Sequence, residues 1–158
     1  MGNFVSFMEF KLEFNNKTKT GIQENFLQET LEKTLACLGA EYSFLKGKSL
    51  NVSLAAVPED EIRKLNKEYR QMDCPTDVLS FSEYSSPEEL KNAVDKEMFL
   101  GEIILCYNYI AEYAKENGEE VQAELARVVS HGLLHLLGFS HGKEMFGIQD
   151  EVIRIILQ

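Results

Sequence analysis

The sequence predicts a single α/β (α+β) domain that spans residues 1–158 and holds one sheet of about four strands packed by helices. First, 158 residues suffice for one domain with a sizeable core. Second, an apolar content of 44% with 10% aromatic residues is typical of globular proteins. Third, strand and helix patterns alternate along the chain without a repeat, a low-complexity segment or a linker, which indicates a layered α/β architecture.

The first elements follow from two different periodicities. Residues 4–14 alternate apolar and polar side chains, which predicts a half-buried strand. Residues 22–38 carry apolar side chains at helical spacing and are followed by Gly39, which predicts a helix that ends there. The apolar run LNVSLAAV at 50–57 predicts a second strand, and Pro58 marks its end.

The middle of the chain holds a helix, a loop and two further strands. Residues 58–70 open with proline and three acidic residues, which suit the first turn of a helix. The loop QMDCPTD leads into a short buried strand at 78–81. Residues 85–97 are polar and predict a surface loop or a short helix, whereas the apolar run at 99–107 predicts a central strand. We expect the last three helices at 108–117, 119–137 and 143–157.

Charge, hydropathy and cysteine content argue against several classes of protein. A formal net charge of −10 argues against a protein that coats nucleic acid nonspecifically. No apolar run approaches the roughly 20 residues that a membrane span needs, and the alternating N-terminus does not resemble a signal peptide. The three cysteines are far apart and form no CxxC motif, so we expect neither a disulfide framework nor a cysteine zinc site. This usage suits a reducing cytoplasm, and we expect a cytoplasmic protein without membrane contact.

All three histidines of the chain lie in the segment HGLLHLLGFSH, residues 131–141. His131 and His135 are four residues apart on a predicted helix, so both imidazoles face the same side and can reach one metal ion. His141 can join them only if the helix stops first. Gly138 is the expected stop, because glycine readily adopts the left-handed conformation that ends a helix.

Three imidazoles with a vacant fourth position describe a catalytic zinc site, in which the pKa of a bound water falls to about 7. We therefore expect His131, His135 and His141 to bind one Zn²⁺ ion, although nickel, copper or cobalt would accept the same nitrogens. Histidines on an apolar helix face are often core residues without a metal. All three histidines of the chain in this spacing favour the metal site.

The same spacing resembles the zinc proteases that use HExxHxxGxxH, in which the glutamate after the first histidine is the general base. Here that position is Gly132. A peptidase of that mechanism would lack its base, which favours another hydrolytic reaction.

A second cluster lies on the helix before the QMDCPTD loop. Arg63, Lys67 and Arg70 form one basic stripe, and we interpret the first two as a solvated helix face. Arg70 stands at the helix end, where its forked guanidinium can hold a phosphate or stabilise charge that develops on it. We interpret Thr76 and Asp77 in the loop as turn formers.

The motifs LNKEYRQMDCPTDVLSF, FLGEIIL and SHGLLHLLGFSH, followed by MF and QDE, resemble the YbeY family of bacterial single-strand endoribonucleases and rRNA maturation factors. The resemblance covers roughly residues 50–155. It implies a mixed four-stranded sheet, a metal usually taken as zinc on His131, His135 and His141, and a role for Arg70 in activity and RNA handling. It also implies single-stranded ribosomal RNA as substrate, notably the small-subunit 3′ end, a role in ribosome quality control, and the ribosome or its bound proteins as partners. DNA is not expected as a substrate.

Two positions depart from the pattern of that family. Ser140 stands where the family usually has aspartate, and Gly101-Glu102 stands where it often has Gly-Asp. Neither change touches the three histidines, but serine cannot act as a base.

Two nucleophiles are compatible with these residues. The nucleophile could be a metal-activated water or the 2′-hydroxyl of the RNA, with Arg70 stabilising the pentavalent transition state. Glu124 lies on nearly the same helix face as His131, either as a hydrogen-bond partner that fixes its tautomer or as a plain surface glutamate.

Three functions remain possible: a metal-dependent endoribonuclease, a metallohydrolase of another substrate such as an atypical peptidase, and a ribosome-assembly binding factor with a structural metal. The vacant fourth position counts against the last, because structural zinc sites usually have four protein ligands.

Overall fold

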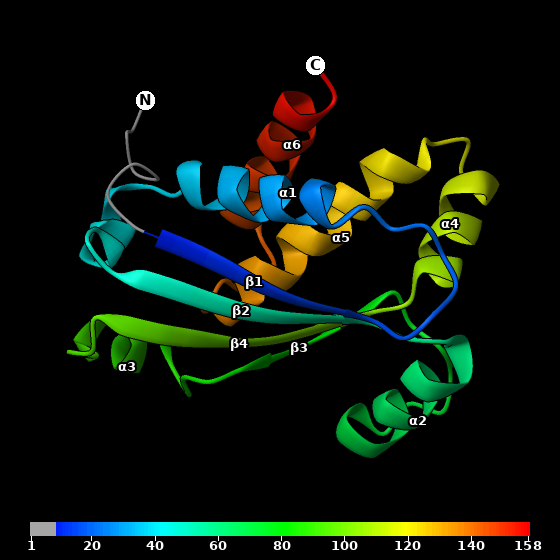
Figure 1. Cartoon of the computed structure of the whole chain (residues 1–158), viewed down its shortest axis with the longest axis horizontal. Coiled ribbons are helices and arrows are strands. Elements are labelled where there is room, and N and C mark those ends of the chain that lie inside the picture. Colours follow the sequence, from blue (N-terminus) through cyan, green and yellow to red (C-terminus); the bar gives the residue numbers. More distant parts are fainter. Residues whose placement is uncertain (1–8) are drawn as a thin grey trace.

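The computed structural model describes residues 9–158, whose centre is a four-stranded sheet in the order β1-β2-β4-β3 (Figure 1). Its strands are β1 (Glu9–Asn16), β2 (Ser49–Ala56), β3 (Val78–Ser82) and β4 (Glu97–Leu105). β1, β2 and β4 run parallel, whereas β3 is antiparallel to β4, so the sheet is mixed as expected. The first strand was expected from residue 4, and its residues 4–8 lie outside the described part of the chain.

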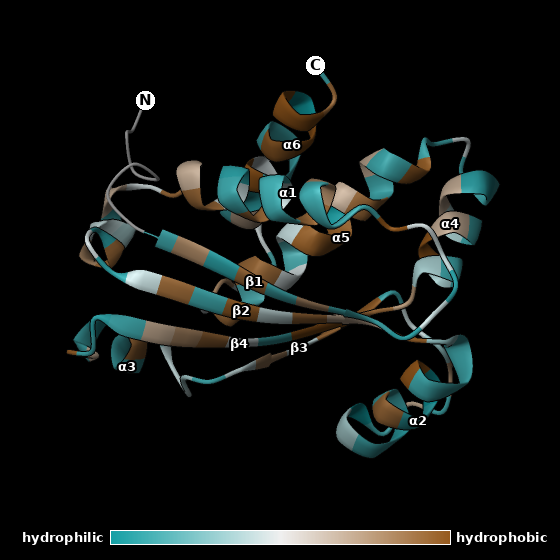
Figure 2. Ribbon diagram, viewed as in Figure 1, coloured by the Kyte–Doolittle hydropathy of each residue, from teal (hydrophilic) through white to brown (hydrophobic). Residues whose placement is uncertain are grey.

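Helices cover the two faces of the sheet unequally (Figure 1). One face packs against α1 (Glu24–Ala36) and α5 (Val121–Leu136), and α6 (Lys143–Ile156) packs on these two helices; this side contains the larger part of the core. On the other face, Ile62 of α2 (Glu59–Arg70) packs on Leu79 and Ile104 at one end of the sheet. Apolar residues accordingly lie along the strands and on the helix sides that face them (Figure 2). The remaining helices are η2 (Ala40–Leu45), α3 (Pro87–Asn92) and α4 (Tyr107–Glu116).

Most element boundaries agree with the sequence-based expectations to within two residues. Two short helices, α3 and η2, lie in segments where the sequence does not predict a definite helix. The polar segment at 85–97 contains α3, because Pro87 occupies its first turn and the Ser86 hydroxyl accepts a hydrogen bond from the Glu89 amide at 3.1 Å. The short 3-10 helix η2 was not predicted. Its Tyr42 hydroxyl donates to the Leu137 carbonyl at 2.8 Å, so η2 supports the end of α5.

Strand β3 lies at the edge of the sheet and is tied directly to α5. The Ser80 hydroxyl donates to the Gly132 carbonyl at 3.3 Å, and the Ser82 hydroxyl donates to the Leu136 carbonyl at 3.0 Å. Gly101 on β4 has a φ of 139°, and a Cβ there would lie 2.2 Å from the Phe81 carbonyl oxygen. Only glycine therefore allows β3 to approach β4 at this point, which holds β3 beside α5.

None of the three cysteines, which all lie within residues 9–158, is paired in a disulfide. Cys37, Cys74 and Cys106 are all free thiols, and Cys106 is buried in the apolar layer next to α2. Within residues 9–158, none of the helices combines the length and the apolar character needed to cross a bilayer.

Candidate metal centre and active-site pocket

Helix α5 carries the first two histidines on the side that faces β3. The rings of His131 and His135 are nearly perpendicular, at an interplanar angle of 85°, and their centroids are 4.4 Å apart. Both residues are half-buried, while their neighbours Leu133, Leu134 and Leu136 are packed in the core. The apolar face of α5 therefore fixes the direction in which both imidazoles point.

Helix α5 ends just before Gly138, as the sequence predicts. Gly138 has a φ of 94° and donates its amide to the His135 carbonyl at 3.0 Å, while the Phe139 amide donates to the Leu134 carbonyl at 3.0 Å. These two bonds form a Schellman motif, which reverses the chain. A Cβ at position 138 would also lie 2.7 Å from Cγ of Pro87, so both conformation and space require glycine here.

The reversal brings His141 back onto the other two rings. Its Nε2 atom lies 3.0 Å from Nε2 of His135 and 3.3 Å from Nε2 of His131. Around a tetrahedral ion with metal–nitrogen bonds of about 2.1 Å, ligand nitrogens are roughly 3.4 Å apart. The three imidazoles therefore fit one metal ion, and within residues 9–158 no Cys, Asp or Glu side chain joins this cluster.

The outer nitrogens of two rings have hydrogen-bond partners of their own. Nδ1 of His135 lies 3.1 Å from the Phe139 carbonyl oxygen, which accepts a hydrogen bond from the Nδ1–H, so Nε2 keeps its lone pair. Nδ1 of His131 lies 2.9 Å from the side-chain amide nitrogen of Gln149, a buried residue of α6, whose N–H donates to it. This bond orients the His131 ring, but Nε2 binds a metal only after it loses its proton or after the amide turns its oxygen toward Nδ1. Both contacts turn Nε2 toward the centre of the cluster, which is the orientation that a metal requires.

Electrostatics keep two of these imidazoles neutral. Burial, together with smaller contributions from the neighbouring His135, His141 and Arg70, lowers the pKa of His131 to about 4. Burial also lowers the pKa of His135, in spite of its bond to the Phe139 carbonyl. Because a metal binds the neutral imidazole, both rings are ready to act as ligands at neutral pH.

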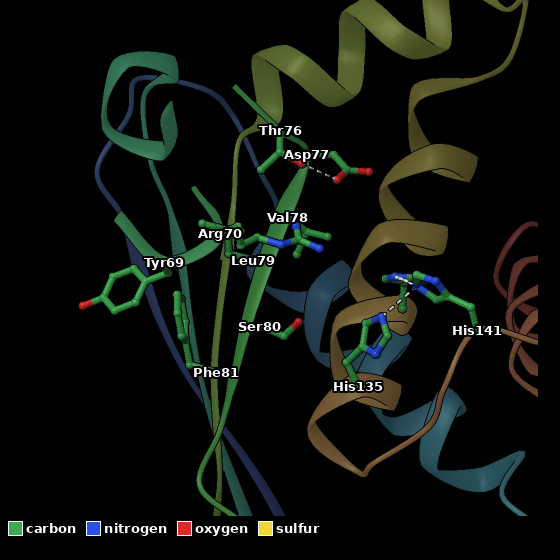
Figure 3. Close-up of a pocket in the computed structure, with 11 residues that line it drawn as sticks. Tyr69, Arg70, Thr76, Asp77, Val78, Leu79, Ser80, Phe81, His135 and His141 are labelled. Carbon is green, nitrogen blue, oxygen red and sulfur yellow. Dashed lines mark hydrogen bonds between the residues drawn. The ribbon is translucent and has the colours of Figure 1, made fainter. Parts of the chain in front are cut away.

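The histidines open into a pocket of about 690 Å³ between α5 and β3 (Figure 3). Arg70 reaches into this pocket toward the histidines from the end of α2, whereas Tyr69 points to the other side of β3 (Figure 3). The remaining lining residues come from the loop before β3 and from β3 itself: Thr76, Asp77, Val78, Leu79, Ser80 and Phe81.

Local structure sets Arg70 apart from the other two cations of the basic stripe. Arg63 and Lys67 are exposed and pair with Asp73 at 2.8 and 4.0 Å, as expected for a solvated helix face. No carboxylate within residues 9–158 pairs with Arg70. Helix α2 ends after Arg70 because Gln71 adopts a left-handed φ of 58°, which directs the following loop toward β3.

The model of the family described as Endoribonuclease YbeY matches residues 13–156, nearly the whole chain. The chain belongs to the YbeY family. The YbeY endoribonuclease of Staphylococcus epidermidis is 34% identical over 150 residues, which cover 91% of this chain and 94% of that protein. That of Bacillus licheniformis is 37% identical over 139 residues, which cover 84% and 86% of the two chains.

A solved structure has the same fold. The solution structure of TM1509 from Thermotoga maritima superposes with a TM-score of 0.59 at 30% sequence identity, and the match covers 92% of this chain and 89% of TM1509. The expected α/β fold of the YbeY family is therefore confirmed.

The two departures from the YbeY pattern have different surroundings. Ser140 is exposed on the turn between Gly138 and His141. Glu102 alternates along β4 with Ile103, which packs on α5, so the Glu102 side chain faces the opposite side of the sheet. Glu102 therefore does not point at the histidines.

Gly132, at the position of the protease glutamate, faces the sheet. A Cβ there would lie 3.0 Å from Cγ2 of Ile103 on β4, which is fully buried. A glutamate at this position would run into the core and would not reach the pocket, which counts against the peptidase alternative.

Glu124 fits neither of its two interpretations. Its side chain is buried, at 5% relative exposure, and accepts a hydrogen bond from Nε of Arg127 at 3.2 Å, so it is not a plain surface glutamate. Burial raises the pKa of this carboxyl, against the opposing effect of Arg127. The partner of His131 is Gln149 instead. In the sequence, Gln149 stands out only as part of the QDE motif, because no residue near it indicates that α6 packs against α5.

Proposed function

We propose that this protein is a metal-dependent endoribonuclease that cuts single-stranded RNA. The observation that carries this function is the presence of three converging imidazoles and one unpaired arginine in the same pocket. Relatives that match most of this chain bear the name endoribonuclease, which indicates RNA as the substrate class.

His131, His135 and His141 would hold one ion through Nε2, and we propose zinc because it favours nitrogen ligands and a vacant fourth position. When bound, such an ion supplies a Lewis acid beside the pocket. The Phe139 carbonyl fixes the His135 ring in the tautomer that leaves Nε2 available, and the Gln149 amide orients the His131 ring with Nε2 toward the other histidines.

Arg70 would act on the substrate and not on the metal ligands. Its guanidinium lies on the opposite wall of the pocket and has no carboxylate partner among the described residues, so a phosphate can take that place. During cleavage the negative charge on the phosphate increases. A hydrogen-bond donor that contacts the phosphate at that moment lowers the barrier.

Membership of the YbeY family suggests the natural substrate and the partners. We propose ribosomal RNA, notably the small-subunit 3′ end, as the natural substrate, with the ribosome or its bound proteins as partners. Three free thiols and no disulfide among the described residues suit the cytoplasm as its location. We assign the activity to the whole chain, residues 1–158, as one domain.

A cleavage assay on a single-stranded RNA oligomer tests this function. We expect the purified chain to cut the oligomer, a chelator to abolish cutting, and added Zn²⁺ to restore it. Arg70→Ala should lower kcat about 100-fold or more while retaining bound metal, as loss of one transition-state donor does. His135→Ala should lose both metal and activity.

Arg63→Ala is the matched control, because Arg63 lies on the same helix and is paired with Asp73 outside the pocket. It should cut RNA like the parent. If Arg70→Ala and His135→Ala both cut as well as the parent, the nuclease proposal is wrong. The product ends identify the nucleophile: a 2′,3′-cyclic phosphate indicates the RNA 2′-hydroxyl, and a 5′-phosphate or a 3′-phosphate with no cyclic precursor indicates water.

A further inference from the structure

The pocket offers few cations to a polyanionic substrate. Within residues 9–158, Arg70 is the only lysine or arginine that lines it. Arg127 lines an adjoining cavity of about 320 Å³ and is already paired with Glu124 at 3.2 Å and Asp150 at 3.5 Å. Because the chain carries a net charge of −10, neutralisation of phosphates contributes little affinity here. Another interaction has to hold the RNA.

Tyr69 presents an open aromatic side chain that lines the pocket beside Arg70 and points to the side of β3 away from the histidines (Figure 3). Its side chain is 56% exposed on the last turn of α2, one residue before Arg70. Its ring meets the edge of Phe81 on β3 at a centroid distance of 5.0 Å and an angle of 70°. Phe81 thus fixes the orientation of Tyr69 and leaves much of its surface to solvent (Figure 3).

Phe146 presents a second open aromatic side chain beyond the histidines. It is 47% exposed on the first turn of α6 and lies nearly parallel to the His141 ring, at a centroid distance of 6.1 Å and an angle of 23°. Phe146 lines the adjoining cavity, which shares His131 and Asp77 with the main pocket. Two exposed aromatic rings therefore line the pocket and its adjoining cavity, Tyr69 next to Arg70 and Phe146 beside His141.

We propose that Tyr69 and Phe146 each stack an unpaired base of the RNA, on the two sides of the phosphate that lies between Arg70 and the histidines. This inference rests on the proposed nuclease function and adds how the substrate is bound. Aromatic side chains stack on any base face, and this contact is available only where the base is not already enclosed in a duplex. Stacking would thus select single strands without recognition of sequence.

Kinetics on the metal-loaded chain give the first test. Tyr69→Ala and Phe146→Ala should each raise KM for a single-stranded RNA about 5-fold to 100-fold with a smaller change in kcat, as expected for loss of one stacked base. Tyr69→Phe and Phe146→Tyr keep the ring and should behave like the parent. Tyr113→Ala is the matched control, because Tyr113 is an equally exposed aromatic residue on α4, at 45%, and lines neither cavity.

A position-resolved measurement separates stacking from a general loss of structure. The fluorescent base 2-aminopurine is placed in turn at each position of the oligomer, and its quenching is recorded by stopped flow before cleavage. The parent should quench it strongly at two positions, of which Tyr69→Ala should lose one and Phe146→Ala the other. Equal quenching in the parent and both alanine variants, or unchanged KM values, would overturn the stacking proposal while the nuclease function stands. A parent that cuts no RNA would overturn the function itself.

Discussion

The side-chain amide of Gln149 on α6 lies 2.9 Å from Nδ1 of His131 on α5, on the side of the ring away from the other histidines. Gln149 is buried, so α6 fixes the orientation of the His131 ring through the nitrogen that points away from the other two histidines. Contacts of this kind fix the tautomer and the ring direction of a ligating histidine.

Removal of this contact should weaken the metal site. We expect Gln149→Ala to lower Zn²⁺ affinity about 10-fold to 100-fold, as loss of an outer hydrogen-bond partner commonly does. Competition with a colorimetric chelator measures the affinity directly. Gln149→Glu places a carboxylate oxygen, which can only accept, beside Nδ1 and so favours the tautomer that leaves Nε2 free; it should bind zinc at least as tightly as the parent. Asp150→Ala at the next, exposed position should bind zinc like the parent. If Gln149→Ala binds zinc like the parent, the packing of α5 alone orients His131.

Gly138 should be the most sensitive glycine of the turn. Gly138→Ala forces an L residue into a left-handed conformation and brings its Cβ within 2.7 Å of Pro87. We expect a loss of about 2 to 4 kcal/mol in the free energy of unfolding, together with weaker metal binding because His141 moves. Urea denaturation measures the first quantity. Gly142→Ala is the control, since a Cβ there meets nothing within 4 Å; equal stability of the two variants would contradict this account.

Stability of the metal-free chain should depend on pH through His131. Burial lowers the pKa of this imidazole from 6.5 to about 4 in the folded state, so the unfolded chain binds more protons between these values. The free energy of unfolding should therefore fall as pH drops from about 6.5 toward 4, by roughly 1 to 3 kcal/mol. Above pH 7 the imidazole is neutral in both states, so titration of His131 should cause no further change in stability with pH. The difference between the parent and His131→Asn, measured by denaturation across this range, isolates the effect. A pH-independent difference would refute it.

Binding of single-stranded RNA should depend only weakly on salt. One unpaired arginine lines the pocket, so few counterions are released when RNA binds. We expect the logarithm of the association constant to fall with a slope of about −0.7 to −1.4 against the logarithm of salt concentration, the value for one or two neutralised phosphates. Fluorescence anisotropy across a salt series gives this slope. A slope steeper than about −3 would show that other basic residues contact the RNA.

The peptidase glutamate cannot be restored at position 132. Gly132→Glu places a charged side chain against the buried Ile103, so we expect a loss of more than about 3 kcal/mol in stability and no cleavage of casein. Thermal unfolding and a fluorescent casein assay measure the two effects. A stable variant that cuts casein would return the peptidase alternative to consideration.

The sequence by itself determined the elements and the local part of the site. The periodicity of apolar residues was sufficient for the strands and the long helices, because burial of one face depends on neighbours along the chain. His131, His135 and the stop at Gly138 were predictable for the same reason, because helix geometry and glycine conformation are local properties. They reverse the chain so that His141 meets the other two rings.

Tertiary structure decided everything that depends on contacts between distant segments. Arg70 and the histidines lie more than 60 residues apart in the chain and meet only because β3 is the edge strand beside α5. Gln149 contacts His131 because α6 folds back on α5, and Glu124 turns to Arg127 and not to the histidine. Gly132 carries no side chain because Ile103 of β4 occupies the adjacent space. Such relationships follow from how the layers pack, and packing is a property of the whole chain that no short motif contains.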